Sequence, residues 1–363
     1  MTITGIINNI QYQPQCAAPL KERPLEGFDI NKAQPAVTVR SGETVVAVSK
    51  WVSPKRTRSY PYERVYNTLP YPNRAAVIPV VKDEGTRGER DFLQWDTAMM
   101  LSLLDVRLVL AYYNAATLRG TSVTNFQFDN EYVVGQLKEL MSSSLSVREW
   151  NIAQLQLLQS GLMERVEQGY DAIATATGAQ MHNDNGFAEF RNTMHHSMEK
   201  FMRYSRKKSQ QAQQREYVTI QPKEALSTLS KAKVSLRDAW GGEYFLTVDE
   251  VEHNGGMLWM IEAKHTAHGL LPSVSDIKDG LLKMILYKNL SDVRADRMPV
   301  SHTPTVKLTS RRLVAPFTTT GSAEGRDEFV TLNGLSRTHQ SILDALINEA
   351  RTNGIEIRLH RAE

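Results

Sequence analysis

Residues 243–266 have the pattern of a β-hairpin, and this pattern constrains the fold more than any other part of the sequence. Two stretches typical of strands, "EYFLTVDEVEH" and "MLWMIEAKHT", flank the sequence "NGG". Such a turn sequence between two strands is a strong hairpin signal, because tight two-residue turns need positive φ angles that glycine adopts freely. The second strand leads an apolar run directly into Glu262 and Lys264. Residues two apart on a strand share a face, so these two charges are expected side by side.

The hairpin brings a second acid to the same face. In an antiparallel pair, directly opposed residues lie on one face. If the two glycines of "NGG" form the turn, Asp249 lies opposite Glu262. If the loop instead begins at His253, the opposed residue is Thr247, and Asp249 is the diagonal neighbour of Glu262. Both registers therefore predict that Asp249, Glu262 and Lys264 converge.

Two further acids could take the place of Asp249. Glu243 has the same parity along the first strand, and Asp238 lies just before "AWGG". The choice among these three acids stays open at the level of the sequence.

Two carboxylates and a lysine on one strand face suggest a magnesium site. Mg²⁺ binds one or two carboxylates together with water and substrate phosphates, and it can activate a bound water. A neighbouring lysine can hold that water or neutralise the phosphate. The alternative is a cross-strand salt bridge on a solvent-facing sheet, which contributes little stability. The run "MLWMI" is apolar on both faces, which indicates a buried strand and favours a functional site.

The acid on one hairpin strand and the Glu-x-Lys at the end of the next resemble the PD-(D/E)xK nuclease superfamily. The sequence "IEAKH", a polar loop and the helical pattern "SDIKDGLLKMILY" are similar to type II restriction endonucleases in particular. The resemblance covers residues 238 to about 290. It implies an α/β fold with a restriction-endonuclease-like mixed β-sheet core flanked by helices. It also implies Mg²⁺-dependent hydrolysis of DNA that leaves 5′-phosphates, with Glu262 as a metal-binding acid and Lys264 as the catalytic lysine. No Pro-Asp pair marks the first acid in this sequence, so Asp249 is the best match by the hairpin geometry, with Glu243 and Asp238 as alternatives.

The rest of the chain divides into stretches of different character. Residues 1–75 predict an irregular N-terminal arm, and residues 76–215 predict a βαβ unit followed by a helical, DNA-clasping insertion. Residues 216–363 are expected to hold the nuclease core, unless all three stretches form one domain. Within the βαβ unit, the acids of the loop "KDEGTRGER" either face a ligand or belong to a solvated loop that ends in a helix N-cap at Asp91.

Basic residues in two places are candidates for DNA contacts. The first group lies in an Arg- and Tyr-rich segment, which is either a DNA-contacting arm or an irregular segment packed on the core. The second group lies at the end of a predicted helix, which is either a phosphate-binding patch or a solvated helix terminus. Together with a histidine next to the lysine of the motif, these candidates are Lys55, Arg56, Arg58, Arg203, Arg206, Lys207, Lys208 and His265.

Composition excludes several classes of protein. No apolar run reaches the length of about 18 residues that a membrane helix requires. The first residues do not have the pattern of a secretory signal, and Cys16 is the only cysteine, which favours a reducing cytoplasm. The sequence contains no phosphate-binding loop motif for ATP. A formal net charge of +3 neither requires nor excludes a polyanionic partner.

These observations predict a Mg²⁺-dependent, sequence-specific endonuclease of a restriction system that acts on double-stranded DNA. A homodimer is expected by analogy, because two-fold symmetry suits palindromic sites. Two alternatives are a structure-specific or repair nuclease of the same superfamily, and a non-catalytic DNA-binding protein with a nuclease-like fold.

Overall fold

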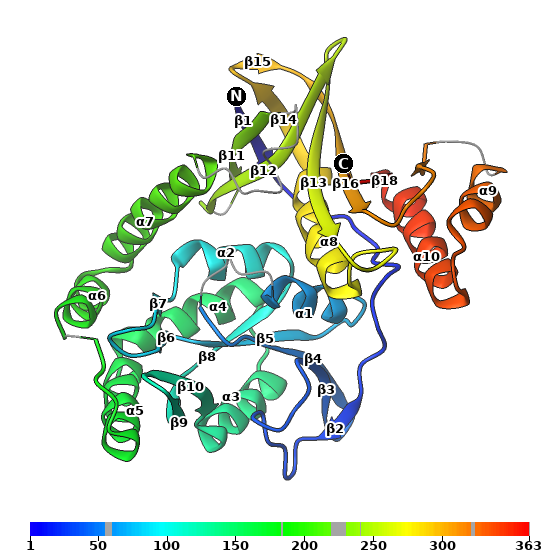
Figure 1. Cartoon of the computed structure of the whole chain (residues 1–363). Helices are drawn as coiled ribbons and strands as arrows, with labels where there is room; N and C mark the ends of the chain where they lie inside the picture. Colours follow the sequence, from blue (N-terminus) through cyan, green and yellow to red (C-terminus); the bar gives the residue numbers. More distant parts are fainter. Residues whose placement is uncertain (55–59, 183, 219–229, 240, 321–323, 363) are drawn as a thin grey trace. The chain divides into compact units, whose positions relative to one another are not determined.

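The computed structural model describes residues 1–54, 60–182, 184–218, 230–239, 241–320 and 324–362 (Figure 1). The chain is mixed α/β and separates into two compact units. Unit 1 consists of Met1–Ala18 and Ser209–Glu363, and unit 2 consists of Pro19–Lys208. The boundary predicted at residue 75 therefore lies inside unit 2. The boundary predicted at residue 215 lies a few residues from the junction of the units, within helix α7 (Met198–Val218).

Unit 1 is built on a mixed sheet that contains both parallel and antiparallel strand pairs. In the described residues this sheet has nine strands. Their spatial order is β15 (Met298–Pro299), β14 (Leu290–Ala295), β1 (Thr2–Ile7), β11 (Ser230–Asp238), β12 (Glu243–Asn254), β13 (Met257–Thr266), β16 (Ser301–Ser310), β18 (Glu356–Arg361) and β17 (Phe317–Thr318). The central strands β11, β12 and β13 are antiparallel, whereas β13, β16 and β18 run parallel.

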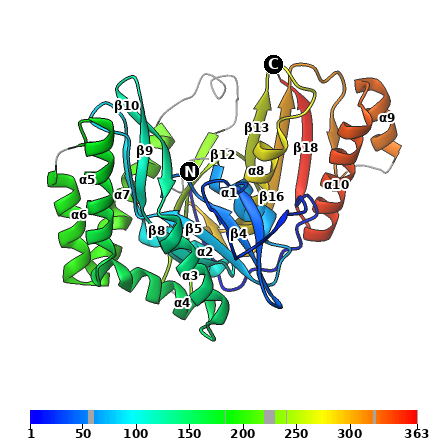
Figure 2. The same cartoon turned by 90° about the horizontal axis from the view of Figure 1, so that it is seen from below.

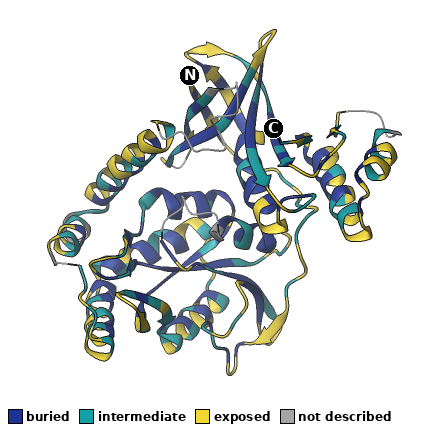
Figure 3. Ribbon diagram, viewed as in Figure 1, coloured by how far each residue is buried: buried dark blue, intermediate teal, exposed yellow. Residues whose placement is uncertain are grey.

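The predicted hairpin is confirmed as β12 and β13. Asn254 pairs with Met257, so the turn consists of Gly255 and Gly256. Their φ angles are 58° and 82°, which other residues adopt only with strain. The tip of this hairpin is exposed, while the strands become buried toward the middle of the sheet (Figure 3).

Helix α8 (Val274–Lys288) connects β13 to the later parallel strand β16. Ser273 caps its first turn by accepting a hydrogen bond from the backbone N–H of Asp276 at 3.1 Å. Nearly the whole helix is buried, from Ile277 to Tyr287. Parallel neighbours need such a crossover, so α8 covers the face of the sheet that carries Glu262.

The last part of unit 1 contains helices α9 (Glu324–Asn333) and α10 (Arg337–Asn353), followed by β18. Figure 2 shows β13, β16 and β18 side by side, with α10 next to β18. The pattern "SRTHQSILDALINEARTNGIEIRL" indicates a helix, a stop at a glycine and a strand, and the structure has α10, Gly354 and β18 at these places.

Unit 2 contains a smaller sheet with the order β2 (Glu22–Pro24), β3 (Ala36–Ser41), β4 (Thr44–Lys50), β5 (Arg74–Pro79) and β8 (Arg107–Ala111). Two hairpins accompany it: β6 (Val81–Asp83) with β7 (Arg90–Phe92), and β9 (Tyr113–Arg119) with β10 (Ser122–Phe128). Its helices are α1 (Tyr60–Thr68), α2 (Trp95–Leu103), α3 (Asn130–Ser142), α4 (Val147–Gln156), the 3₁₀ turn η1 (Leu157–Gln159), α5 (Leu162–Thr177), α6 (Asp184–His196) and the first part of α7. The βαβ prediction is confirmed, because β5 and β8 are parallel neighbours joined through α2.

Three local predictions are wrong. The first 75 residues are not an irregular arm, since they contain β1 to β4, the helix α1 and the first residues of β5. Asp91 is not a helix N-cap: it lies buried in β7, and α2 begins after Gln94. Within the predicted helical insertion, the pattern "SVREWNIAQLQLLQSGLMERVEQGYDAIATATG" suggests one continuous helix, but the chain is interrupted at Gly161, whose φ of 108° is incompatible with a continuous helix.

No helix in the described residues is long and apolar enough to cross a membrane. The core of each unit consists of strands and helix faces that are buried against one another (Figure 3).

Candidate active site

The register of the hairpin places Asp249 beside Glu262. The ladder runs from Asn254–Met257 to Glu250–Ile261, and one further step sets Asp249 opposite Glu262. A direct contact fixes this end of the hairpin, because Asp249 Oδ2 accepts a hydrogen bond from the Ala263 N–H at 2.9 Å. The register with Thr247 as the opposed residue is therefore excluded.

Glu262 is buried and is held by two lysines. Its side chain is 2% exposed. Lys283 Nζ lies 2.9 Å from Oε1 and 2.8 Å from Oε2, and Lys264 Nζ lies 3.1 Å from Oε1. Burial alone would raise the pKa of Glu262, but the two ammonium groups outweigh it and lower this pKa. Glu262 is therefore ionised.

Lys264 bridges Glu262 to a third acid. Its ammonium lies 2.8 Å from Asp279 Oδ2 on α8. Burial opposes the charge on Lys264, but Glu262 and Asp279 more than compensate and raise its pKa to about 12. Helix α8 passes beside this lysine at Gly280, where a Cβ would be in ordinary contact, 3.5 Å from Lys264 Cε. Lys264 is thus a fixed, charged donor.

Asp249 differs from the other acids because it is only half-buried and does not touch a lysine. Burial and the charge of Glu262 raise its pKa to about 7, although Lys283 acts in the opposite direction. Its Oδ1 makes no hydrogen bond within the described residues, so it is available to a ligand.

The charges of the cluster do not balance. Asp249, Glu262 and Asp279 contribute three negative charges when ionised, whereas Lys264 and Lys283 contribute two positive charges. The remaining charge of −1 resides on the side of Asp249. A cluster with this net charge attracts positive charge to the opposed carboxylates of Asp249 and Glu262. That positive charge can be a proton or a metal ion.

The donor set fits a hard divalent cation. Carboxylate oxygens are the ligands that Mg²⁺ prefers, and Asp249 Oδ1 is an acceptor without a partner among the described residues. Buried Asp279 Oδ1 also lacks a hydrogen-bond partner there. Within the same residues, no group of three His, Cys, Asp or Glu side chains is placed to form a complete protein-only metal site. A magnesium ion at this place would take Asp249 Oδ1 directly and would have to share the Glu262 oxygens with Lys283 and Lys264, its other ligands being water and substrate.

The two alternative acids lie away from this cluster. Asp238 is buried at the turn before β12, where it accepts hydrogen bonds from the Gly242 N–H and the Tyr244 hydroxyl. Glu243 pairs with Arg237, with 3.3 Å between Oε1 and Nε. Asp249 lies six residue steps beyond Glu243 along β12, which is roughly 20 Å along a strand. Both acids stabilise the start of the hairpin and do not reach Glu262.

Asp279 and Lys283 were missed at the level of the sequence. They are four residues apart on α8, so they share a helix face. The sequence feature that could have identified these two residues is the presence of charged side chains and a glycine inside the otherwise apolar helix α8. Such charges need partners when the helix is buried on nearly all sides.

The basic candidates within the described residues differ in their local contacts. His265 lies on the opposite strand face from Lys264, with its Nδ1 3.0 Å from Thr309 Oγ1. Arg206 Nε lies 3.5 Å from buried Asp96, and Arg203 pairs with Glu199 at 2.6 Å.

Lys207 and Lys208 are exposed and so stay available for phosphate contacts. Lys55, Arg56 and Arg58 lie outside the described residues.

The acids of the β6–β7 hairpin are engaged in structural contacts of unit 2. Asp83 Oδ1 lies 2.6 Å from His182 Nδ1, and Glu84 pairs with Lys82 at 2.7 Å. Asp91 accepts a hydrogen bond from the Ser53 hydroxyl at 2.8 Å.

Comparisons with family models, with curated proteins and with solved structures find no match for this chain.

Proposed function

We propose that the chain is a Mg²⁺-dependent, sequence-specific DNA endonuclease of the type II restriction class. The observation that carries this proposal is the convergence of Asp249, Glu262 and Lys264 at the centre of a mixed sheet. The elements around it support the proposal: an antiparallel hairpin of β12 and β13, the helix α8 after it, and β16, which follows β14 and β15 in the chain and pairs parallel with β13.

In this proposal Asp249 and Glu262 hold the magnesium ion. When bound, Mg²⁺ polarises the phosphodiester and lowers the pKa of a water molecule that it coordinates. Asp249 supplies an ionised oxygen above pH about 7, and Glu262 is ionised already.

Lys264 acts as an electrostatic group and not as a base. Because its pKa is raised to about 12, it stays protonated at neutral pH. Its ammonium can stabilise the negative charge that develops on the phosphate oxygens as water attacks phosphorus. The P–O3′ bond then breaks, the 3′ oxygen takes up a proton, and the product strand keeps a 5′-phosphate.

A plasmid cleavage assay tests the proposal. Purified protein with plasmid DNA and Mg²⁺ should give discrete fragments, and EDTA should prevent cleavage. Glu262→Gln should lower the rate by at least about 100-fold, because an isosteric amide cannot replace the ionised oxygens. The matched control is Glu243→Gln, the same substitution at the far end of the hairpin, which should cleave like the wild type.

A second candidate function has one observation in its favour. Both carboxylate oxygens of Glu262 are already occupied by ammonium groups. A non-catalytic DNA-binding protein could use the same cluster as a buried ion-pair network. Salt-sensitive DNA binding without Mg²⁺-dependent cleavage of plasmid, viral or branched DNA would support it. Smeared or branch-dependent products would instead indicate a structure-specific nuclease.

A further inference from the structure

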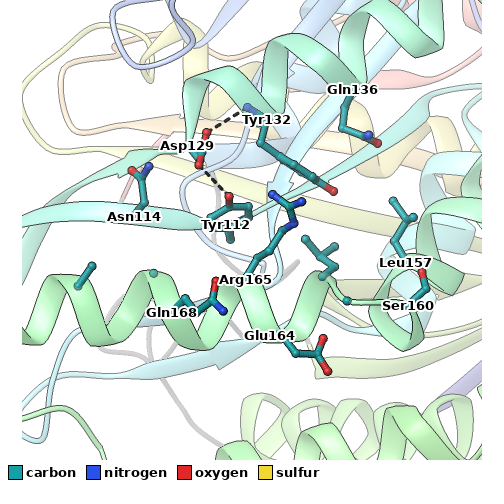
Figure 4. A pocket seen from close by; sticks show the side chains of 14 residues that line it. Tyr112, Asn114, Asp129, Tyr132, Gln136, Leu157, Ser160, Glu164, Arg165 and Gln168 are labelled. Carbon is teal, nitrogen blue, oxygen red and sulfur yellow. Dashed lines mark hydrogen bonds between the residues drawn. The ribbon is translucent and has the colours of Figure 1, made fainter.

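A pocket of about 770 Å³ lies within unit 2, in a part of the chain that the proposed active site does not use. Figure 4 shows it between α3 and α5, with Tyr112 at its floor and η1 at one end. Its volume is in the range of pockets that bind small molecules. Because all its lining residues belong to unit 2, the pocket is complete within that unit.

A line of polar contacts fixes the floor of the pocket. The Tyr112 hydroxyl donates to Asp129 Oδ2 at 2.7 Å, and Asp129 Oδ1 accepts from the Tyr132 N–H at 3.0 Å. Asp129 is the N-cap of α3, so its carboxylate stabilises the helix N-terminus and also accepts the hydrogen bond from Tyr112. The two oxygens of Asp129 are therefore both engaged and do not need a further partner.

Arg165 is the exposed cation of the pocket. Its guanidinium contacts the Tyr112 hydroxyl and lies 5.7 Å from the centre of the Tyr132 ring. No salt bridge joins Arg165 to a carboxylate among the described residues. Figure 4 shows that Glu164, its neighbour on α5, points away from this group. Arg165 thus has N–H groups available for a ligand.

Two aromatic rings and two amides complete the recognition surface. The rings of Tyr112 and Tyr132 are 5.2 Å apart and inclined at 56°. Asn114 on β9 and Gln168 on α5 line the same pocket and are exposed to it. Rings that can stack, together with a guanidinium and amides that read hydrogen-bonding edges, are a combination suited to a planar heterocycle.

We propose that this pocket binds a nucleobase, with its face against Tyr132 and an acceptor edge on Arg165. A guanine edge, with O6 and N7 side by side, is the best match for a guanidinium fork. The base can come from a free mononucleotide or from a nucleotide exposed in single-stranded DNA. This proposal goes beyond the proposed cleavage function and does not depend on it, because the site lies in the other unit.

Calorimetric titrations of the full chain in EDTA test the proposal without any cleavage. The two probes are deoxyguanosine monophosphate and a short single strand with one guanine among thymines. Saturable binding of the mononucleotide identifies a free nucleotide as ligand, and saturable binding of the strand alone identifies DNA as the source. No saturable binding of either probe at millimolar concentration would overturn the proposal, whatever the plasmid assay shows.

Matched variants locate the binding site. Arg165→Gln should weaken binding about tenfold or more, since a bidentate contact is lost. Arg119→Gln, at an exposed arginine of β9 outside the pocket, should bind like the wild type. Equal binding by the Arg165 variant and the wild type would also overturn the proposal.

Tyr132 gives an independent readout if the Arg165 variant does not fold. Tyr132→Phe should retain binding and Tyr132→Leu should lose about tenfold, because only the ring stacks on a base. Equal affinities of these two variants would contradict the stacking mode.

Discussion

Lys283 Nζ lies 2.9 Å and 2.8 Å from the two carboxylate oxygens of Glu262, so one ammonium spans the whole carboxylate. The lysine comes from α8 and the acid from β13, and both side chains are largely buried. This pair ties the crossover helix to the strand that carries the proposed catalytic residues.

Removal of Lys283 should destabilise unit 1 strongly. Lys283→Met leaves Glu262 buried with Lys264 alone, and breaking a buried pair costs about 3–5 kcal/mol. The free energy of unfolding in urea measures this loss. Lys288→Met, at an exposed position on the same helix, should cost less than about 1 kcal/mol. If Glu262→Gln is added to the Lys283 variant, stability should partly recover, and strictly additive losses would contradict a direct coupling.

Asp279 is expected to position Lys264. Asp279→Asn removes one of the two charges that hold the ammonium, so cleavage should fall by about 10–100-fold, as for other residues that orient a site. Since Asp279 is not placed against substrate, kcat should fall while KM stays near that of the wild type. Lys264→Ala should lose more than Asp279→Asn. An Asp279 variant as inactive as the Lys264 variant would show a more direct role.

Magnesium affinity should depend on pH through Asp249. Its pKa is raised to about 7, so below this pH a metal ion must displace a proton. Affinity should therefore rise by about tenfold per pH unit up to pH about 7 and level off above it. Calorimetric titration of Mg²⁺ from pH 5.5 to 8.5 (about one point per half unit) checks this. The Asp249→Asn variant should bind weakly and without this slope.

The same carboxyl group makes the free energy of unfolding depend on pH. The folded pKa of Asp249 lies near 7, above the ordinary value of 3.8, so the folded chain binds the proton more tightly than the unfolded chain. The stabilisation from this proton is complete below pH about 4 and is lost as pH rises through 7. Urea unfolding at pH 5 and pH 8, relative to Asp249→Asn, isolates this contribution. A wild type that gains stability relative to the variant over this interval would contradict the assigned pKa.

Two helical glycines should respond oppositely to alanine. At Gly280 a Cβ would meet Lys264 Cε at 3.5 Å, an ordinary contact, so Gly280→Ala should stabilise by up to about 1 kcal/mol. At Gly169 on α5 a Cβ would lie 2.1 Å from the Tyr113 carbonyl oxygen, so Gly169→Ala should destabilise by about 1–3 kcal/mol. Thermal unfolding of both variants checks the contrast, and a stabilised Gly169 variant would disprove the close approach of α5 to β9.

Local patterns predicted the part of the site that is local in sequence. Asp249, Glu262 and Lys264 lie on one hairpin, so the alternation of strand residues and the turn glycines suffice to bring them together. Asp279 and Lys283 reach the cluster only because the crossover places α8 over β13. The sequence predicted that helix, but not which of its faces contacts the strand.

Long-range pairing accounts for most of what the sequence did not reveal. The stretch from Thr2 to Ile7 has no strong strand pattern, yet it becomes a strand because β11 and β14 supply partners on both sides. In the same way Asp91 has the composition of a helix cap, but pairing with Lys82 across the β6–β7 hairpin determines its conformation. Tertiary context outweighs local preference at both positions.

The parallel pair of β1 and β11 has a consequence for synthesis on the ribosome. Thr2 pairs with Lys233, so β1 leaves the ribosome long before the strand beside which it belongs. At typical translation rates of about 5–20 residues per second, this delay is on the order of tens of seconds. Unit 2 is continuous in sequence and can fold in that interval. The N-terminal strand must therefore remain unpaired through most of translation, at the stage when a newly made chain depends most on chaperones.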